Sequence, residues 1–190
     1  MQTMSSKIPW HANLPSPRAV PLQLAVSELR STMDDPSKRA GVDYVVVDVR
    51  RADMDVSHSR LLDYHTGSIT YPFDPQEQEA DGKMIIPGAI NLPAQTFHQT
   101  LPTLIAILSR SVEYAVVLRI FSQFTQVLHY WCRIPRVIFH CSSSNGRGPR
   151  CAGWYQDALN QDKITSSKAY VLTGGIKAWK EAHPEDLRPL

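Results

Sequence analysis

The sequence has few cysteines, no long apolar run and almost no net charge. Its three cysteines are an odd number and predict no disulfide framework. The 20 basic and 18 acidic residues are scattered, so the net charge of +2 gives no support for nucleic-acid binding. No segment approaches the ~18 apolar residues of a membrane span, and residues 1–20 lack a secretory-signal pattern. These absences favour one domain in a reducing compartment, the cytoplasm, with the nucleus as the alternative.

The sequence also lacks the spacing typical of a metal site. A long polar stretch runs from Asp53 to Met84 without any tight pair such as His-x3-His, so we interpret it as a solvated loop. We expect no metal and no resident cofactor. The acids and histidines of this stretch are Asp53, Asp55, His58, Asp63, His65, Asp74, Glu77, Glu79 and Asp81.

The most informative motif has five residues between Cys141 and Arg147, a Cys-x5-Arg spacing. The apolar run from Val137 to Phe139 predicts a buried strand before it, and Gly148-Pro149 predicts a helix start after it. In a strand, loop and helix of this kind, loop amides and the helix dipole create a site for an anion. We therefore expect the loop to bind a tetrahedral oxyanion.

Cys141 and Arg147 are the predicted catalytic residues. A thiol at a helix N-terminus beside a cation titrates at roughly 3.5–7.5, so Cys141 is expected to attack as a thiolate. The planar fork of Arg147 suits two oxygens of an oxyanion. Ser142 or Ser144 is a possible hydrogen-bond donor to the sulfur. The predicted substrate-binding residues are Ser142, Ser143, Ser144, Asn145, Gly146 and Arg147.

Other polar residues near the motif favour structural roles. Cys132 and Cys151 are interpreted as structural cysteines, the common role of buried cysteine. His140 is either a buried core histidine or a group that tunes the thiolate. Asp48 and Arg50, at the end of a strand, are predicted to form an ion pair or to anchor a turn.

The remaining patterns predict an α/β fold with a central, mainly parallel sheet flanked by helices. The apolar run from Val42 to Val49 fits a parallel strand covered on both faces. Residues 94–110 have helical spacing despite Pro102, and Ser27 is placed to cap a short helix. We expect a flexible arm over residues 1–21 and one catalytic domain over residues 22–190, with insertions near 54–85 and 111–134.

The segment from His140 to Arg150 (HCSSSNGRGPR) resembles the active-site loop of the M-phase inducer phosphatases and the eukaryotic arsenate reductases, which share the rhodanese fold. The segments Tyr44–Arg50 (YVVVDVR), Ile86–Pro93 (IPGAINLP) and Val171–Trp179 (VLTGGIKAW) resemble further rhodanese landmarks in the expected order. The resemblance covers roughly residues 40–182 and implies a single rhodanese-like domain.

Comparison with these families separates the possible reactions. Sulfur-transferring rhodaneses have a shorter loop, so sulfur transfer is the weaker alternative. The phosphatase loops carry acids where this chain has Ser142 and Gly146, and often a protective cysteine where it has Val49. Cys151 is a doubtful substitute for that cysteine. A missing general acid matters because such an acid contributes about 10²–10⁴-fold to phosphate-ester cleavage.

The stretch from Ser111 to Ile134 interrupts what is a short link in the related proteins. Three hypotheses remain open: an added amphipathic helix, a partner-binding segment, or translated sequence that is normally spliced out. The last follows from how cleanly Ser109-Arg110 would join Ile134-Pro135.

We expect a Cys-dependent protein phosphatase, of tyrosine or dual-specificity type, that forms a phosphocysteine. The alternatives are an arsenate reductase that uses glutathione and glutaredoxin, a thiosulfate-type sulfurtransferase, and a slow module that binds a phosphorylated partner. The expected partner is a phosphorylated protein or a small oxyanion, with no nucleic acid or membrane. The sequence does not define the oligomeric state.

Overall fold

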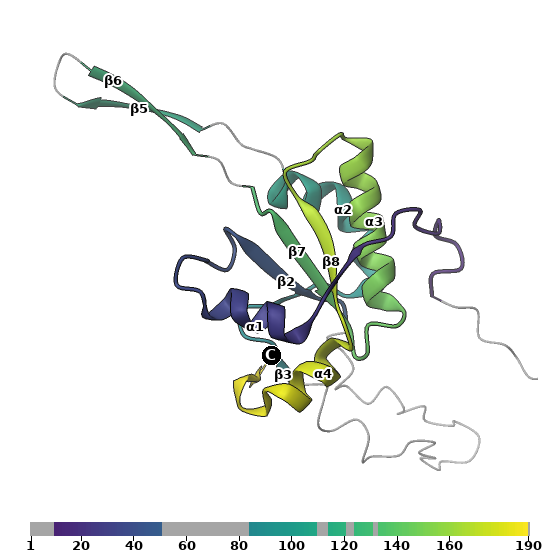
Figure 1. Cartoon of the computed structure of the whole chain (residues 1–190). Helices are drawn as coiled ribbons and strands as arrows, with labels where there is room; N and C mark the ends of the chain where they lie inside the picture. Colours follow the sequence, from purple (N-terminus) through teal and green to yellow (C-terminus); the bar gives the residue numbers. More distant parts are fainter. Residues whose placement is uncertain (1–9, 51–83, 110–113, 121–123, 131–132, 190) are drawn as a thin grey trace, which may run out of the picture.

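A five-stranded parallel sheet forms the centre of the molecule (Figure 1). The computed structural model describes residues 10–50, 84–109, 114–120, 124–130 and 133–189. The strand order is β1-β8-β7-β2-β4, so β7 is the middle strand. The strands are β1 (Leu22–Leu24), β2 (Tyr44–Asp48), β4 (Ile90–Asn91), β7 (Arg136–His140) and β8 (Lys168–Leu172).

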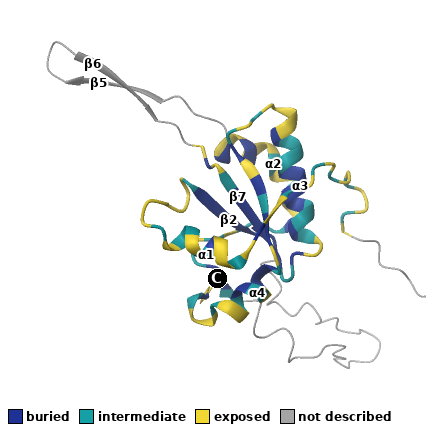
Figure 2. Ribbon diagram, viewed as in Figure 1, coloured by how far each residue is buried: buried dark blue, intermediate teal, exposed yellow. Residues whose placement is uncertain are grey.

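Helices cover both faces of this sheet. Successive strand residues point to opposite faces, so Val45 and Val47 pack in one core while Tyr44 and Val46 pack in the other. The first core lies under α2 (Ala94–Leu108) and α3 (Arg147–Gln161). The second lies under α1 (Val26–Asp34) and α4 (Gly175–Ala182). Figure 2 shows the buried residues concentrated along this three-layer interior.

The sequence-predicted elements agree with the structure except at the start of α1 and in the insertion at 111–134. The predicted strand 42–49 is observed as β2, and the predicted helix 94–110 is observed as α2 with Pro102 inside it. The predicted cap at Ser27 is wrong. Ala25 is the N-cap, because the amide of Leu29 bonds the Ala25 carbonyl at 3.1 Å, so helix α1 begins at Val26 and Ser27 already lies inside it. The methyl side chain of Ala25 cannot cap the helix.

Two small antiparallel sheets lie outside the main one. β3 (Met84–Ile85) pairs with β9 (Arg188–Pro189), next to the short 3-10 helix η2 (Pro184–Asp186). β5 (Tyr114–Ile120) pairs with β6 (Phe124–Tyr130), and Figure 1 shows this hairpin extending away from the body. The hypothesis of an added helix in 111–134 is therefore wrong. Both strands are rich in the β-branched and aromatic residues that favour extended backbone.

The described part of the N-terminal arm lies along α3. The Trp154 indole N–H donates to the carbonyl of Pro15 at 2.7 Å. The amides of Arg18 and Ala19 donate to the carboxylate of Asp157 at 2.7 and 2.9 Å. Hydrogen bonds between α3 side chains and the backbone of residues 15–19 hold this segment of the expected arm against the domain.

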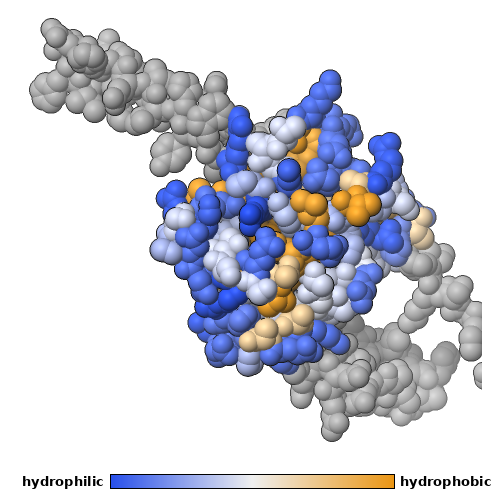
Figure 3. Space-filling model, in the orientation of Figure 1, coloured by the Kyte–Doolittle hydropathy of each residue, from blue (hydrophilic) through white to orange (hydrophobic). Residues whose placement is uncertain are grey.

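The surface seen in Figure 3 is mainly hydrophilic, with smaller hydrophobic areas near its centre. The exposed apolar side chains include Val20, which precedes the edge strand β1, and Leu22, which begins it. Within the described ranges, we find no helix with the length and apolar character to cross a membrane.

Candidate active site

Cys141 follows the last residue of β7, at the carboxyl end of the middle strand. β7 lies between β2 and β8, with His140 opposite Asp48 and Phe139 opposite Val171. Ligands of open parallel sheets bind at the carboxyl ends of the strands. The Cys141 side chain is 4% exposed. The sheet therefore places a nearly buried thiol at the edge where a ligand site is expected.

Residues 141–146 form a tight loop that leads directly into α3. Ser144 has a left-handed φ of 54°, and its Oγ accepts the Cys141 N–H at 3.4 Å. Ser144 thus bonds the backbone of Cys141 rather than its sulfur. Gly148 lies so close that a Cβ there would sit 3.4 Å from both the Cys141 nitrogen and Ser144 Oγ. This close approach brings the start of α3 against Cys141.

The start of α3 supplies positive charge to the loop. Arg147 is the first residue of this 15-residue helix, which has no acidic residue in its first turn. First-turn N–H groups have no acceptor inside the helix and carry partial positive charge. A helix start of this kind, which also carries Arg147, is typical of sites that bind anions.

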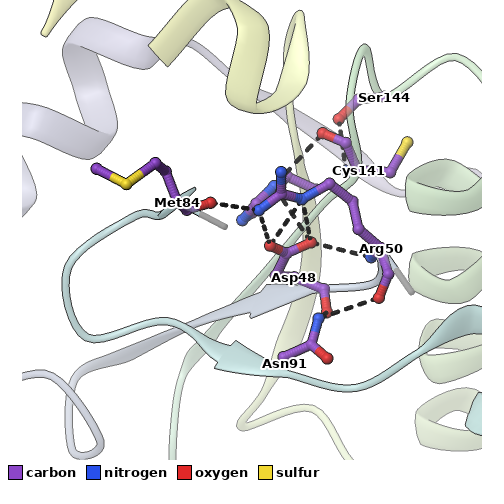
Figure 4. A network of polar contacts seen from close by, with 7 residues as sticks. Asp48, Arg50, Met84, Asn91, Cys141 and Ser144 are labelled. Atoms are coloured by element: carbon purple, nitrogen blue, oxygen red, sulfur yellow. Dashed lines mark hydrogen bonds and ion pairs between the residues drawn. The ribbon is translucent and has the colours of Figure 1, made fainter. Parts of the chain in front are cut away.

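A buried ion pair supports the strand next to Cys141 (Figure 4). Asp48 is fully buried and Arg50 is 4% exposed. The Asp48 carboxylate accepts the Arg50 amide at 2.9 Å and the guanidinium at 2.6 Å. Arg50 also donates to the Met84 carbonyl at 2.6 Å, and the Asn91 amide donates to the backbone carbonyls of Asp48 and Arg50. The predicted structural role of the Asp48–Arg50 pair is confirmed.

His140 is a fully buried histidine between this ion pair and the loop. Its Nδ1 lies 3.4 Å from the Cys141 carbonyl oxygen and 3.9 Å from Asp48 Oδ1. Burial lowers the pKa of His140, the Asp48 charge opposes this effect, and Arg50 adds to it. Nε2 is buried without a hydrogen-bond partner among the described residues. The core-histidine interpretation fits this position.

Cys151 lies inside α3 and is completely buried. It packs in the same core as Cys141, and both are free thiols. Burial first, and then the charge of Cys141, strongly raise the pKa of the Cys151 thiol. Val49, also fully buried, occupies the position of the protective cysteine. Cys132 lies outside the described residues.

The structure shows one contact of the loop that the sequence analysis did not predict. The amide of Ile176 donates to the Cys141 carbonyl at 3.0 Å, and the amide of Lys177 donates to the Ser142 carbonyl at 3.1 Å. Both amides belong to the first turn of α4. In the sequence, the Gly174-Gly175 pair before them was the only signal, and it indicated the fold rather than a contact.

The structure thus brings the predicted site residues together at one end of β7. The acids between Asp53 and Asp81, which include the possible general acids, lie outside the described residues.

Two other features lie elsewhere. His183, Glu185 and Asp186 form a group with metal-ligand spacing, but Asp186 is already paired with Arg30. A hollow of about 360 Å³ has residues from α1 and Arg136 in its lining. Arg136 begins β7, so this hollow lies at the opposite end of that strand from Cys141.

No protein-family model matches the chain. A stretch of 46 residues is 41% identical to Arsenical-resistance protein 2 of Saccharomyces cerevisiae, and it covers 24% of this chain. The match spans 35% of that protein, about a third of its length.

Two solved structures are similar over most of their length. The As-Sb reductase of Leishmania major is 18% identical, with a TM-score of 0.50, over 88% of this chain and 84% of that chain. Ygr203w, described as a yeast protein tyrosine phosphatase of the rhodanese family, is 18% identical, with a TM-score of 0.53, over 88% and 90%. At this identity the similarity shows the fold. The chain therefore has the rhodanese fold, and it resembles the rhodanese-fold phosphatases and arsenate reductases whose active-site loop its own loop matches.

Proposed function

We propose that this protein is a Cys-dependent enzyme that acts on a tetrahedral oxyanion, and that arsenate is its substrate. The observation that carries the proposal is that Cys141 lies at the end of β7, against the first turn of α3, which begins with Arg147. A nucleophile beside a cluster of amides and a guanidinium suits attack on a centre surrounded by oxygens.

Arsenate is favoured over a phosphate ester because the loop from Cys141 to Arg147 has no carboxylate. An ester needs an acid to protonate the alkoxide or phenolate that leaves, whereas an arsenate oxygen leaves as water. The partial match to an arsenical-resistance protein supports the same choice. This order reverses the expectation from sequence, which placed the phosphatase first.

The proposed reaction begins with attack of the Cys141 thiolate on arsenic. An S–As bond forms and an As–O bond breaks, and the released hydroxyl takes up the proton that the Cys141 thiol gave up and leaves as water. Arg147 and the loop amides hold the remaining oxygens. A second thiol, glutathione in the related enzymes, then attacks the Cys141 sulfur. The S–As bond breaks and its electron pair stays on arsenic. Arsenate and two thiols are thereby converted into arsenite, a disulfide and water, and a thiol reductant such as glutaredoxin restores Cys141.

Phosphatase activity is the second candidate, because the same loop would hold a phosphoryl group during transfer to Cys141. The general acid would have to come from outside the loop. Asp48 is unsuited to this role because its carboxylate is buried and bonded to Arg50. The acids of residues 53–81 remain available for it. Both reactions require a reduced thiol, so we propose a reducing compartment, the cytoplasm or the nucleus.

The proposal is tested by comparing wild type with Cys141→Ser in three assays. These assays are arsenate with glutathione and glutaredoxin, an aryl phosphate, and thiosulfate with cyanide. We expect arsenite formation by wild type and a loss of at least about 10³-fold in Cys141→Ser, because a hydroxyl is a much weaker nucleophile than a thiolate at neutral pH.

Cys151→Ala is the matched control, since it removes a buried thiol from the same core at a position in α3, outside the loop. We expect this variant to keep activity close to wild type. Phosphate release without arsenite formation would transfer the assignment to the phosphatase. Equal rates for wild type and Cys141→Ser in every assay would contradict both candidates and leave the binding-module hypothesis.

A further inference from the structure

The first turn of α4 holds the active-site loop from outside. The amides of Ile176 and Lys177 are the second and third of the helix, where a helix offers no internal acceptor. They bond the carbonyls of Cys141 and Ser142 instead, at 3.0 and 3.1 Å. The N-cap Gly174 makes no side-chain cap. The loop itself therefore caps α4, and α4 in turn fixes two consecutive peptide groups of the loop.

Fixing these carbonyls also fixes the direction of the amides that face the other way. The described chain has no cis peptide bond, and in a trans peptide the C=O and N–H bonds point in opposite directions. When the carbonyls of Cys141 and Ser142 point toward α4, the N–H groups of Ser142 and Ser143 point away from it. An oxyanion cradle needs several amides directed to one point before the ligand arrives.

Only glycine at position 175 permits this contact. Gly175 has a φ of +63°, and a Cβ there would lie 2.4 Å from the Cys141 carbonyl oxygen and 2.6 Å from the Ser142 carbonyl oxygen. Both clashes are with backbone atoms, so no change of rotamer relieves them. Helix α4 has little freedom to retreat, because Ile176 is 2% exposed and Trp179 is fully buried in the core below.

We propose that the start of α4, entered through Gly175, is a positioning element that directs the amides of Ser142 and Ser143 toward the bound oxyanion. The proposal rests on the oxyanion chemistry proposed for Cys141. It assigns Gly175 and the amides of Ile176 and Lys177 a part in ligand binding without contact to the ligand.

Gly175→Ala tests the contact, and Gly174→Ala is its matched control. Gly174 has a similar φ of +74°, so an alanine there pays a similar backbone penalty. Its Cβ would meet Ala178 Cβ at 2.5 Å, inside α4 itself, and no loop atom is among its near neighbours. Thermal unfolding followed by circular dichroism would confirm that both variants fold.

A second pair isolates one hydrogen bond in case Gly175→Ala does not fold. Lys177 is exposed in the first turn of α4, where proline is tolerated because no hydrogen bond inside the helix is lost. Lys177→Pro deletes the amide that binds the Ser142 carbonyl, while Lys177→Ala retains it. The difference between the two variants measures the amide apart from the side-chain charge.

The readout is protection of Cys141 from iodoacetamide by inorganic phosphate and by arsenate, with the alkylated peptide identified by mass spectrometry. We expect Gly175→Ala and Lys177→Pro to need at least about tenfold more oxyanion for half-protection than Gly174→Ala and Lys177→Ala, respectively. Where wild type turns over arsenate, kcat should fall together with this affinity.

This readout separates the inference from the proposed reaction. Wild type could show no turnover while phosphate still protects Cys141. If Gly175→Ala then abolishes that protection, the positioning role is supported and the proposed arsenate reduction is contradicted. If Gly175→Ala and Lys177→Pro fall within threefold of their controls, the positioning role is overturned whatever the turnover. Absence of any oxyanion protection in wild type would overturn it as well.

Discussion

Two charged side chains and a histidine are buried at the carboxyl ends of the two central strands, yet they are satisfied to different degrees. Asp48 and Arg50 neutralise each other and also bond nearby backbone groups. His140 has long contacts from Nδ1 to the Cys141 carbonyl and to Asp48, and its Nε2 is unpartnered within the described structure. Burial disfavours a protonated His140, and Arg50 adds to this effect while Asp48 opposes it, so the folded protein favours the neutral ring.

This imbalance predicts a pH-dependent stability. The pKa of His140 is lowered in the folded state, so below its ordinary value of ~6.5 the unfolded chain binds the proton more readily. Stability is then present above that pH and is lost as the pH falls through it. Between pH 7 and 5.5, the free energy of unfolding measured in urea should fall by about 1 kcal/mol more for wild type than for His140→Asn. Asparagine keeps an N–H donor near Nδ1 but does not titrate. Parallel pH profiles would contradict the assignment.

At the scale of elements, α3 connects the site to the N-terminal arm. Its first turn faces Cys141, while Trp154 and Asp157 further along hold residues 15–19. Gly153 permits this contact, since a Cβ there would lie 2.7 Å from Pro17. The arm thereby covers an outer part of the helix that carries Arg147.

The docking of the arm predicts protection from proteolysis. Asp157 accepts the N–H of Arg18 at 2.7 Å and the N–H of Ala19, which is part of the peptide bond between Arg18 and Ala19, at 2.9 Å. Trypsin cleaves after arginine only where the chain opens locally. Asp157→Ala should therefore be cut after Arg18 about tenfold faster than wild type, measured by mass spectrometry of timed digests. Glu181→Ala, which removes an exposed carboxylate from α4, is the charge-matched control. A cleavage rate for Asp157→Ala equal to that of this control would mean that the hydrogen bonds do not hold the arm.

At the scale of the whole molecule, the β5–β6 hairpin is not part of the main sheet of the domain. The two strands pair with each other and are not part of the five-stranded sheet. At the base of the insertion, the amide of Ile134 donates to the carbonyl of Leu108 at 2.9 Å. The end of α2 and the approach to β7 are therefore in hydrogen-bond contact, and the body needs only a short connection between them.

This contact predicts that residues 111–133 are dispensable for folding. Joining Arg110 to Ile134 would leave two residues between Leu108 and Ile134, so the existing hydrogen bond becomes the i to i+3 bond of a β-turn. We expect the shortened protein to unfold within about 3 °C of the full chain and to retain alkylation of Cys141. Calorimetry and peptide mass spectrometry would measure both. A Tm lowered by more than about 10 °C, or loss of cooperative unfolding, would show that the hairpin supports the domain.

Local patterns determined much of the fold. β2 and α2 were predictable because alternation and helical spacing act within a few residues. The loop between β7 and α3 was predictable for the same reason, since Cys141, Arg147 and Gly148 lie within one short segment. The Asp48–Arg50 pair followed from two neighbouring residues at a strand end. Residues 114–130 were harder, because a short apolar stretch fits a helix or a strand equally well.

The sequence by itself determined the rhodanese-like order of elements and the chemical groups near Cys141. Only the tertiary structure decided what surrounds them. The amides of Ile176 and Lys177 on the loop, the unpartnered nitrogen of His140 and the arm on α3 depend on segments far apart in the chain. Such contacts arise from packing in three dimensions, where a glycine that permits close approach matters only once its neighbour is known.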